Sequence, residues 1–163
     1  MSQQNGSDFC TMRGYDAPCV RQFSVFLDNK VGKLYELLEV FDSRTDVQIC
    51  ALSVVDSTDY AVVRLIPSNS TVSRQLLRER GLGFAEISLL VVELTRDHSL
   101  TSLCLYLLGA EINIRFAYPL MLRPHGAPTI ALAVDDYVLA GQILRNKNFD
   151  LLGEADLPIP GFE

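Results

Sequence analysis

One spacing of apolar residues occurs twice in this chain, and the second occurrence lies 66 residues after the first. The intervals i, i+3, i+4 and i+7 are shared by two sets of residues: Leu34, Leu37, Leu38 and Phe41, and Leu100, Leu103, Cys104 and Leu107. These intervals predict a helix with one apolar face. Because the spacing recurs at a fixed displacement, we expect the chain to contain a duplicated structural unit.

Runs that favour β-structure surround each predicted helix. In the first half they cover residues 23–27, 47–55, 60–66 and 87–94. A second helix carries Val72, Leu76 and Leu77 between a capping Ser or Asn at 68–70 and a terminating Gly81. The order β-α-β-β-α-β predicts a ferredoxin-like fold, in which two helices cover one face of a four-stranded antiparallel sheet.

The second half repeats this order. It has β-runs at 112–122, 129–134 and 151–152, and a helix capped by Asp135 or Asp136. Because few residues separate the halves, the run 84–94 must both close the first unit and open the second. We therefore expect an α+β protein with two ferredoxin-like βαββαβ repeats. The expected divisions are a flexible leader (1–20), a first repeat (21–90), a second repeat (91–155) and a C-terminal tail (156–163).

Composition argues against several classes of partner. The 14 basic residues are scattered and outnumbered by 20 acidic ones, for a net charge of −6, which disfavours binding to nucleic acid. No stretch reaches the roughly 18 consecutive apolar residues of a membrane span. The N-terminus lacks the basic start and apolar run of a secretory signal, so we expect a cytoplasmic location without disulfides. The four cysteines lack metal-site spacing, and no metal is expected.

The sequence offers little for catalysis. His98 and His125 are the only histidines, and His125 lies in a Pro–His–Gly turn where exposure is the ordinary expectation. The segment 81–83 lacks the third glycine of a dinucleotide fingerprint, and no phosphate-binding loop is present. We therefore expect no catalytic residue, no cofactor and no enzymatic activity.

Two segments resemble an ACT domain: residues 23–34, FSVFLDNKVGKL, and residues 54–66, VVDSTDYAVVRLI. The resemblance covers roughly residues 21–155 as a tandem pair, a form found as stand-alone amino-acid-binding proteins. It implies domains that pair side by side through their sheets, with a free amino acid held at the seam by the loop between the first strand and first helix. Relatives of this kind are sometimes described as acetolactate synthase regulatory subunits.

The resemblance assigns candidate effector-binding residues: Asp28, Asn29, Lys30, Val31, Gly32, Lys33, Leu34, Asn113, Ile114 and Arg115. In the loop, Gly32 permits close backbone approach, Asn29 offers a donor and an acceptor, and the helix start presents N–H groups to a carboxylate. The opposite wall is the segment 113–116 if the halves pair within the chain, or 48–52 of another subunit if they do not. Two interpretations of Arg115 stay open: its guanidinium donates two hydrogen bonds to a ligand carboxylate, or it is an ordinary charged side chain at the sheet edge.

The second repeat departs from this pattern. Thr95 stands where the first repeat has Asn29, and His98 stands where it has Gly32, so its loop is not expected to bind in the family manner. The leading hypothesis is a regulatory amino-acid-binding protein. The alternatives are a regulatory small subunit of an acetolactate-synthase-like enzyme and a ligand-free pairing module. Outer strands with unpaired backbone groups predict a homodimer, and a partner enzyme remains a candidate.

Overall fold

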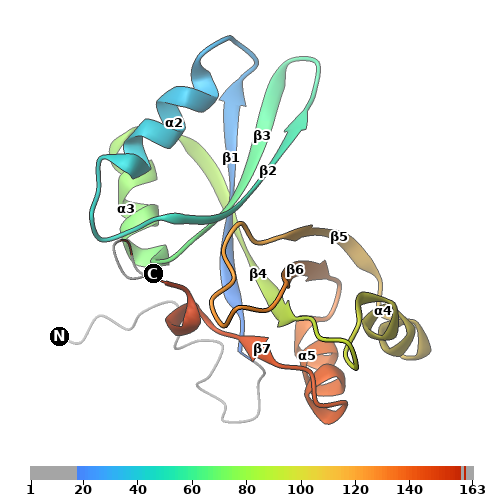
Figure 1. Ribbon diagram of the computed structural model, residues 1–163. Coiled ribbons are helices and arrows are strands. Elements are labelled where there is room, and N and C mark those ends of the chain that lie inside the picture. Colours follow the sequence, from blue (N-terminus) through green and yellow to red (C-terminus); the bar gives the residue numbers. More distant parts are fainter. Residues whose placement is uncertain (1–17, 159, 161–163) are drawn as a thin grey trace, which may run out of the picture.

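The computed structural model describes residues 18–158 and residue 160 (Figure 1). Its strands are β1 (Val20–Asp28), β2 (Ile49–Asp56), β3 (Tyr60–Pro67), β4 (Gly83–Glu93), β5 (Ile114–Pro119), β6 (Thr129–Val134) and β7 (Leu151–Leu152). Its helices are α2 (Lys33–Asp42), α3 (Ser70–Glu79), α4 (Leu100–Gly109), α5 (Tyr137–Asn146) and the short 3-10 helix η1 (Glu154–Asp156). The expected leader lies outside the described residues as far as residue 17, and so do residues 159 and 161–163 of the expected tail.

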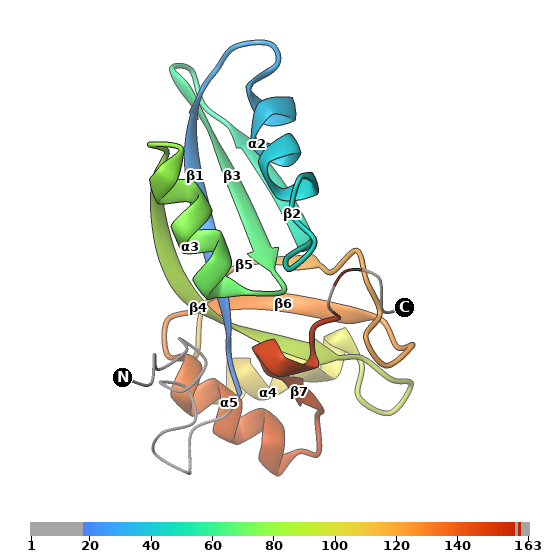
Figure 2. The ribbon, with the colours of Figure 1, turned by 90° about the vertical axis from the view of Figure 1, so that its left-hand side faces the viewer.

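The strands form one curled antiparallel sheet in the order β2-β3-β1-β4-β6-β5, with β7 paired to β4. β4 belongs to both repeats: residues 83–89 pair with β1, and residues 90–93 pair with β6. Each repeat thereby has its second, third, first and fourth strands side by side, which is the ferredoxin-like order. Helices α2 and α3 cover one face of the first repeat, and α4 and α5 cover one face of the second (Figures 1 and 2).

The sheet faces without helices pack against each other where the two repeats meet. Val20, Leu89 and Val91 lie in this shared core, and Tyr118 donates a hydrogen bond of 2.6 Å to the Oε1 atom of buried Gln22. Burial raises the pKa of the Tyr118 hydroxyl above its usual value. The shared core fixes the position of one repeat on the other.

A second inter-repeat contact sits at the edge of this joint. The Arg64 guanidinium lies 3.8 Å from the centre of the Phe116 ring, a cation–π contact between β3 and β5. Close by in the fold, the backbone N–H of Met121 donates to the carbonyl of Cys50 at 2.9 Å. β2 and β5, the two outer strands of the sheet, therefore approach each other at one end and diverge from there (Figure 1).

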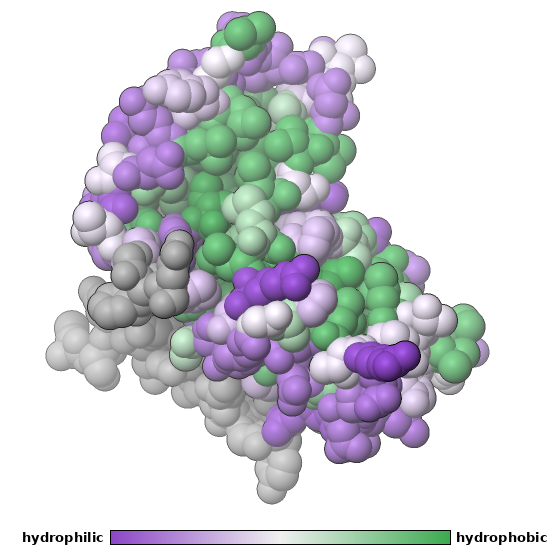
Figure 3. Space-filling view, in the orientation of Figure 1, coloured by the Kyte–Doolittle hydropathy of each residue, from purple (hydrophilic) through white to green (hydrophobic). Residues whose placement is uncertain are grey.

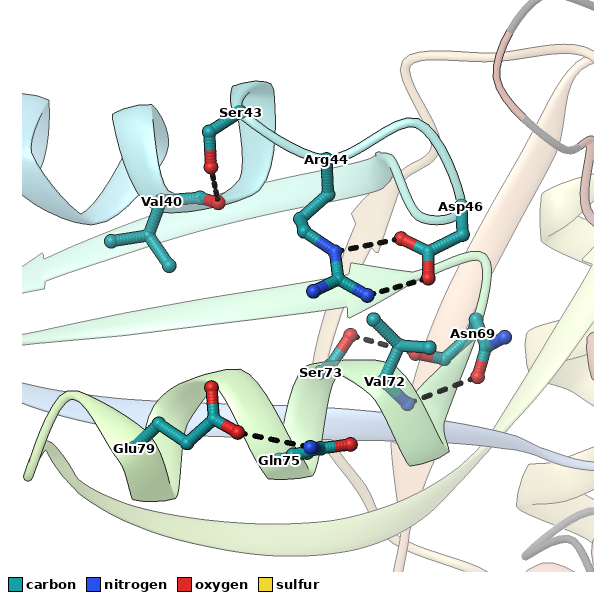
Figure 4. A network of polar contacts seen from close by, with 9 residues as sticks. All are labelled: Val40, Ser43, Arg44, Asp46, Asn69, Val72, Ser73, Gln75 and Glu79. Atoms are coloured by element: carbon teal, nitrogen blue, oxygen red, sulfur yellow. Dashed lines mark hydrogen bonds and ion pairs between the residues drawn. The ribbon is translucent and has the colours of Figure 1, made fainter.

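Helix α3 begins with a side-chain cap, shown in Figure 4. The Oδ1 atom of Asn69 accepts from the N–H of Val72 at 3.1 Å, and Ser73 Oγ donates to the Asn69 carbonyl at 2.7 Å. Of the three capping residues that the sequence offered, the structure uses Asn69. Figure 4 also shows that the Arg44 side chain donates two hydrogen bonds to the Asp46 carboxylate. These hydrogen bonds hold the pKa of the Asp46 carboxyl below its usual value.

Two sequence expectations need correction. β5 covers Ile114–Pro119 and not residues 112–122, because its N-terminal end follows a turn at Glu111 with φ of 57° and its C-terminal end turns away toward Cys50. The expectation of no disulfides is wrong for Cys19, which is disulfide-bonded. Among the helices of residues 18–158, none has the length and apolar character needed to cross a membrane.

Candidate functional site

The loop 29–32 between β1 and α2 lies against the turn 57–59 between β2 and β3, and we call this junction the first corner (Figure 1, top). The side-chain amide of Asn29 joins its two parts. Its Nδ2 atom donates to Asp56 Oδ1 at 3.0 Å and to the Ser57 carbonyl at 3.2 Å. Asn29 thus holds the loop against the hairpin, and its own Oδ1 atom has no hydrogen-bond partner among the described residues.

A pocket of about 220 Å³ opens at the first corner. It is lined by Leu27, Asp28, Asn29, Lys30, Lys33, Leu34, Val54, Asp56, Ala61 and Val63. Two carboxylates and two ammonium groups therefore surround a wall of aliphatic side chains. Because pockets for drug-sized ligands usually measure about 300–1,000 Å³, this volume suits a smaller molecule.

The start of α2 adds backbone donors to this pocket. Gly32 precedes the helix with φ of 92°, a left-handed conformation that glycine adopts without strain, and no side chain caps α2. The other three α-helices of the described residues each have a side-chain cap, from Asn69, Ser99 and Asp136. The first-turn N–H groups of α2 consequently lack the side-chain acceptor that the other helices have, which is the arrangement that attracts an anion.

The structure brings together most of the loop residues that the sequence singled out. Asp28, Asn29, Lys30, Lys33 and Leu34 line the pocket. Lys33 also pairs with Glu36 at 3.1 Å on the exposed face of α2. Neither Gly32 nor Val31 contributes to the lining, and the Val31 side chain is fully exposed.

The other three candidates, Asn113, Ile114 and Arg115, lie at the start of β5 in the second repeat. Within one chain they are remote from the first corner: β2 and β5 meet near Cys50 and diverge from it, and the two places lie at opposite ends of these strands (Figure 1). Ile114 packs into the core of the second repeat, and the backbone N–H of Asn113 donates to Asp135 Oδ1 at 3.2 Å.

The sequence reasoning did not single out the wall of the pocket opposite the loop. This wall comes from the first repeat's own hairpin: Val54 and Asp56 on β2, and Ala61 and Val63 on β3. Asp56 lies one residue beyond the predicted β-run 47–55 and is the last residue of β2. Alternation of side chains between the two faces of this hairpin could have predicted the wall. Val54 pairs with Val63, so both side chains project to the same face of the sheet.

The second corner is the loop 94–99 between β4 and α4 together with the loop 120–128 between β5 and β6. Its β-α loop is closed by its own hydrogen bonds. Thr95 Oγ1 accepts from the N–H of His98 at 3.1 Å and lies 3.2 Å from the His98 ring, and Ser99 caps α4 by accepting from the N–H of Ser102. The His98 ring also packs edge-on against Phe149, with ring centres 5.0 Å apart.

A buried carboxylate lies in the second corner. The side chain of Glu93, the last residue of β4, is only 8 % exposed, and the Nδ1 atom of His125 from the β5–β6 loop lies close to its Oε1 atom, which has no hydrogen-bond partner among the described residues. His125 had been expected to be an ordinary exposed turn residue. The structure confirms this exposure, because the His125 side chain is 52% exposed, and it adds the proximity of the ring to Glu93 at the end of β4.

A larger groove of about 550 Å³ lies beside α2 and shares Leu27 and Lys33 with the first-corner pocket. It continues over Leu37 and Val40 toward Arg80 at the end of α3. In the second repeat, α4 and α5 contact each other. Within residues 18–158, no group of three or more His, Cys, Asp or Glu side chains is placed to hold a metal ion.

Comparisons with known structures agree with this architecture. Protein BT0572 from Bacteroides thetaiotaomicron matches with a TM-score of 0.75 at 20% identity, covering 86% of this chain and 96% of that one. The ligand-free regulatory subunit of aspartate kinase from Thermus thermophilus matches with a TM-score of 0.53 at 9% identity, covering 83% and 96%. At such identities these likenesses show the fold alone. The search among curated proteins gave no match.

The family comparison is more specific. The family described as an ACT domain pair matches residues 18–158, which include both corners and the shared strand β4. The resemblance noted in two segments of the sequence thus extends over both repeats, including the second, whose loop lacks the amide and the glycine. This chain belongs to the family of ACT domain pairs.

Proposed function

We propose that this protein is a regulatory protein without catalytic activity that binds a free amino acid at the first corner. The observation that carries the proposal is the 220 Å³ pocket, where two carboxylates, two lysines and an uncapped helix start surround an aliphatic wall. Membership of the ACT domain pairs supports it. So does the aspartate kinase neighbour, a regulatory subunit with a similar fold.

The charges of the pocket suit a zwitterion. The ligand carboxylate would accept hydrogen bonds from the first-turn N–H groups of α2, beside the Lys33 ammonium. The ligand ammonium would lie toward Asp28, Asp56 and the unengaged Oδ1 atom of Asn29. Each end of an amino acid backbone then meets the opposite charge.

The remaining lining selects the ligand's side chain. Leu34, Val54 and Val63 present aliphatic surface, and the volume leaves room for a small group only. We therefore propose an amino acid with a compact apolar side chain. Burying that side chain would contribute about 0.8 kcal/mol per CH₂ group, so affinity should rise with each added methylene until the pocket is full.

Binding would couple the loop to the hairpin. In the free protein the Asn29 amide alone joins loop 29–32 to Asp56 and Ser57 through side-chain hydrogen bonds. A ligand that contacts α2, β2 and β3 together would stiffen this junction and the strand edge beyond it. Such coupling commonly has a magnitude of about 1–3 kcal/mol, enough to favour one arrangement over another. Asn113, Ile114 and Arg115 would take part only if a second chain brought them to the corner.

Isothermal titration calorimetry of the full chain against the twenty amino acids tests the proposal. We expect heat from one or a few small apolar amino acids. The amide and the des-amino acid of the best ligand should each bind at least tenfold more weakly, because each removes one of the two charges. Binding heats that are absent for all twenty would contradict the proposal and favour a ligand-free pairing module.

A matched pair of variants locates the site. Asp56→Asn should weaken binding, because it removes a carboxylate that lines the pocket and accepts from Asn29. Asp97→Asn, an exposed acid in the loop of the second corner, is the control and should leave affinity unchanged. Equal losses in both variants would place the ligand elsewhere.

A further inference from the structure

The groove of about 550 Å³ beside α2 takes no part in the function proposed above. It runs between α2 and the connection from α3 to β4, on the face of the first repeat toward which Figure 2 looks. Its volume lies within the range of about 300–1,000 Å³ that small-molecule sites usually have. We call it the helix groove and define it by four floor residues and two rim residues: Leu27, Leu37, Val40 and Leu82, and Glu39 and Arg80.

The floor of the helix groove is aliphatic and belongs to the core of the first repeat. Leu37 and Val40 of α2 are buried, and so is Leu27 of β1. Leu82, directly before β4, is half-buried against the same core cluster. Because three elements supply these side chains, the packing of the fold fixes the floor. Such a floor favours a ligand with apolar side chains.

The two rims of the helix groove carry opposite charges. On α2, Glu39 is exposed, and its carboxylate has no hydrogen bond or ion pair with any described residue. On the other rim, Arg80 at the end of α3 is also exposed, and its guanidinium likewise has no partner within residues 18–158. The remaining charged lining residues, Lys33 and Glu36, pair with each other at 3.1 Å. One anion and one cation are therefore available on opposite sides of an aliphatic floor.

We propose that the helix groove is a second binding site, and that its ligand is a short peptide with free termini and aliphatic side chains. The peptide carboxylate would meet the Arg80 guanidinium, whose fork of N–H donors matches two carboxylate oxygens. The peptide ammonium would meet the Glu39 carboxylate. The proposal does not depend on binding of a free amino acid at the first corner.

Charge and size select a peptide over simpler ligands. An aliphatic carboxylate would pair with Arg80 and leave Glu39 unpaired, and an uncharged apolar molecule would leave both unpaired. A single amino acid carries both of its charges at one carbon atom, whereas the helix groove has more than twice the volume of the first-corner pocket. A peptide separates its two charges and carries apolar side chains between them.

The length of the helix groove agrees with a peptide of about two or three residues. Its α2 lining runs from Lys33 to Ser43, which is a rise of about 15 Å at roughly 1.5 Å per residue. An extended peptide spans at most about 3.6 Å per residue, so about two or three residues cover roughly 7–11 Å. Both charged ends of such a peptide lie inside the groove.

Isothermal titration calorimetry of the full chain with leucyl-leucine tests the proposal. We expect this dipeptide to bind. Leucyl-leucine amide and N-acetyl-leucyl-leucine should each bind at least tenfold more weakly, because each lacks one terminal charge. Octanoate has an aliphatic chain and a carboxylate but no ammonium, and it should also bind at least tenfold more weakly. Absence of heat from leucyl-leucine, or equal affinity for octanoate, would overturn the proposal.

Variants that remove one charge assign each end of the peptide. Arg80→Gln should weaken leucyl-leucine binding at least tenfold and leave the affinity for the amide unchanged, because the amide has no carboxylate. Glu39→Gln should weaken leucyl-leucine binding but not that of N-acetyl-leucyl-leucine. Arg78→Gln and Asp42→Asn are the matched controls, since these exposed residues of α3 and α2 lie outside the lining. Equal losses in a variant and its control would contradict the proposal.

The same titrations separate the helix groove from the first corner. Asp56→Asn removes a carboxylate that lines the first-corner pocket and not the helix groove, so it should leave the affinity for leucyl-leucine unchanged. Arg80→Gln should in turn leave the affinity for a free amino acid unchanged. Loss of leucyl-leucine binding in Asp56→Asn would place the peptide at the first corner and overturn the second site.

Discussion

Asp28 and Glu93 occupy equivalent positions in the two repeats, yet their surroundings differ. Each ends the first strand of its repeat, and Asp28 pairs with Tyr60 as Glu93 pairs with Thr129. Asp28 is exposed and lines a pocket, whereas Glu93 is buried and lies beside His125. The turn at the first corner has three residues, while nine residues connect β5 to β6 at the second. At the first corner the end of the strand thus borders a pocket, whereas at the second corner the long β5–β6 loop lies against it.

The largest effect is expected from removing the group that closes the second corner. His125→Ala should lower the free energy of unfolding by about 2 kcal/mol, because the buried Glu93 carboxyl group would lose the only imidazole nitrogen that lies beside it. Solvent around the half-exposed imidazole keeps the effect from being larger. Amide hydrogen exchange should accelerate in the loop 120–128 and not in the loop 29–32. Arg123→Ala, an exposed residue of the same loop, serves as control in urea unfolding. Equal losses in the two variants would mean that His125 does not hold this corner closed.

A ligand titration compares the two loops directly. Asn29→Ala should weaken amino acid binding about tenfold, or about 1.4 kcal/mol, because it frees the loop from Asp56 and Ser57. Thr95→Ala changes the equivalent position of the second corner and should leave the affinity unchanged. Calorimetry with the best ligand measures both. If Asn29→Ala binds as tightly as the wild type, the loop contact assigned from the family is wrong even though the fold is right.

Backbone conformation should cause a smaller difference between the two repeats, namely in how a Gly→Ala substitution changes the free energy of unfolding. Gly32→Ala should destabilise the protein by about 1 kcal/mol, because φ of 92° is unfavourable for a residue with a Cβ atom, although nothing obstructs that atom. Gly109→Ala, at the end of α4, has equal space and no positive φ, and should stabilise by a few tenths of a kcal/mol. Thermal or urea unfolding gives both values. A gain in stability for Gly32→Ala would show that the loop does not need a left-handed residue.

The smallest expected effect on stability comes from Cys50, which lies in the core shared by the two repeats. Burial raises the pKa of the Cys50 thiol from 9.0 to about 12, so the folded state retains a proton that the unfolded state loses above pH 9. This contribution to stability is complete below pH 9 and disappears as pH rises toward 12, a loss of less than about 1 kcal/mol at pH 9.5. Cys50→Ala should flatten the alkaline decline in the urea midpoint. An unchanged slope would indicate that other groups cause the decline.

The repeat, the element order and the loop of the first corner were predictable from sequence, because each depends on local spacing. The four positions shared by α2 and α4 follow helical intervals, and the Asn–Gly loop follows a clear strand. The single apolar face predicted for α4 is only half right, because Leu103 and Leu107 are buried whereas Leu100 and Cys104 are exposed. The pairing of His125 with Glu93 was not predictable, since 32 residues separate them and a Pro–His–Gly sequence is typical of exposed turns.

Contacts between residues far apart in the sequence also decide which residues belong to the candidate site. Val54 and Val63 complete the pocket only because β2 and β3 pair in register beside β1. Arg115 was assigned to the same site from the family pattern alone. The curl of the sheet, where Tyr118 packs on Gln22 and Arg64 packs on Phe116, places the start of β5 away from the first corner. Such curvature has no local sequence signal.

The most direct test of the open and closed corners is a backbone amide chemical-shift map of the full chain with the best-binding amino acid. The account predicts changes at residues 28–34 and at 54–63, with residues 93–99 and 120–128 unmoved. Changes concentrated at the second corner, or spread evenly over both, would contradict it.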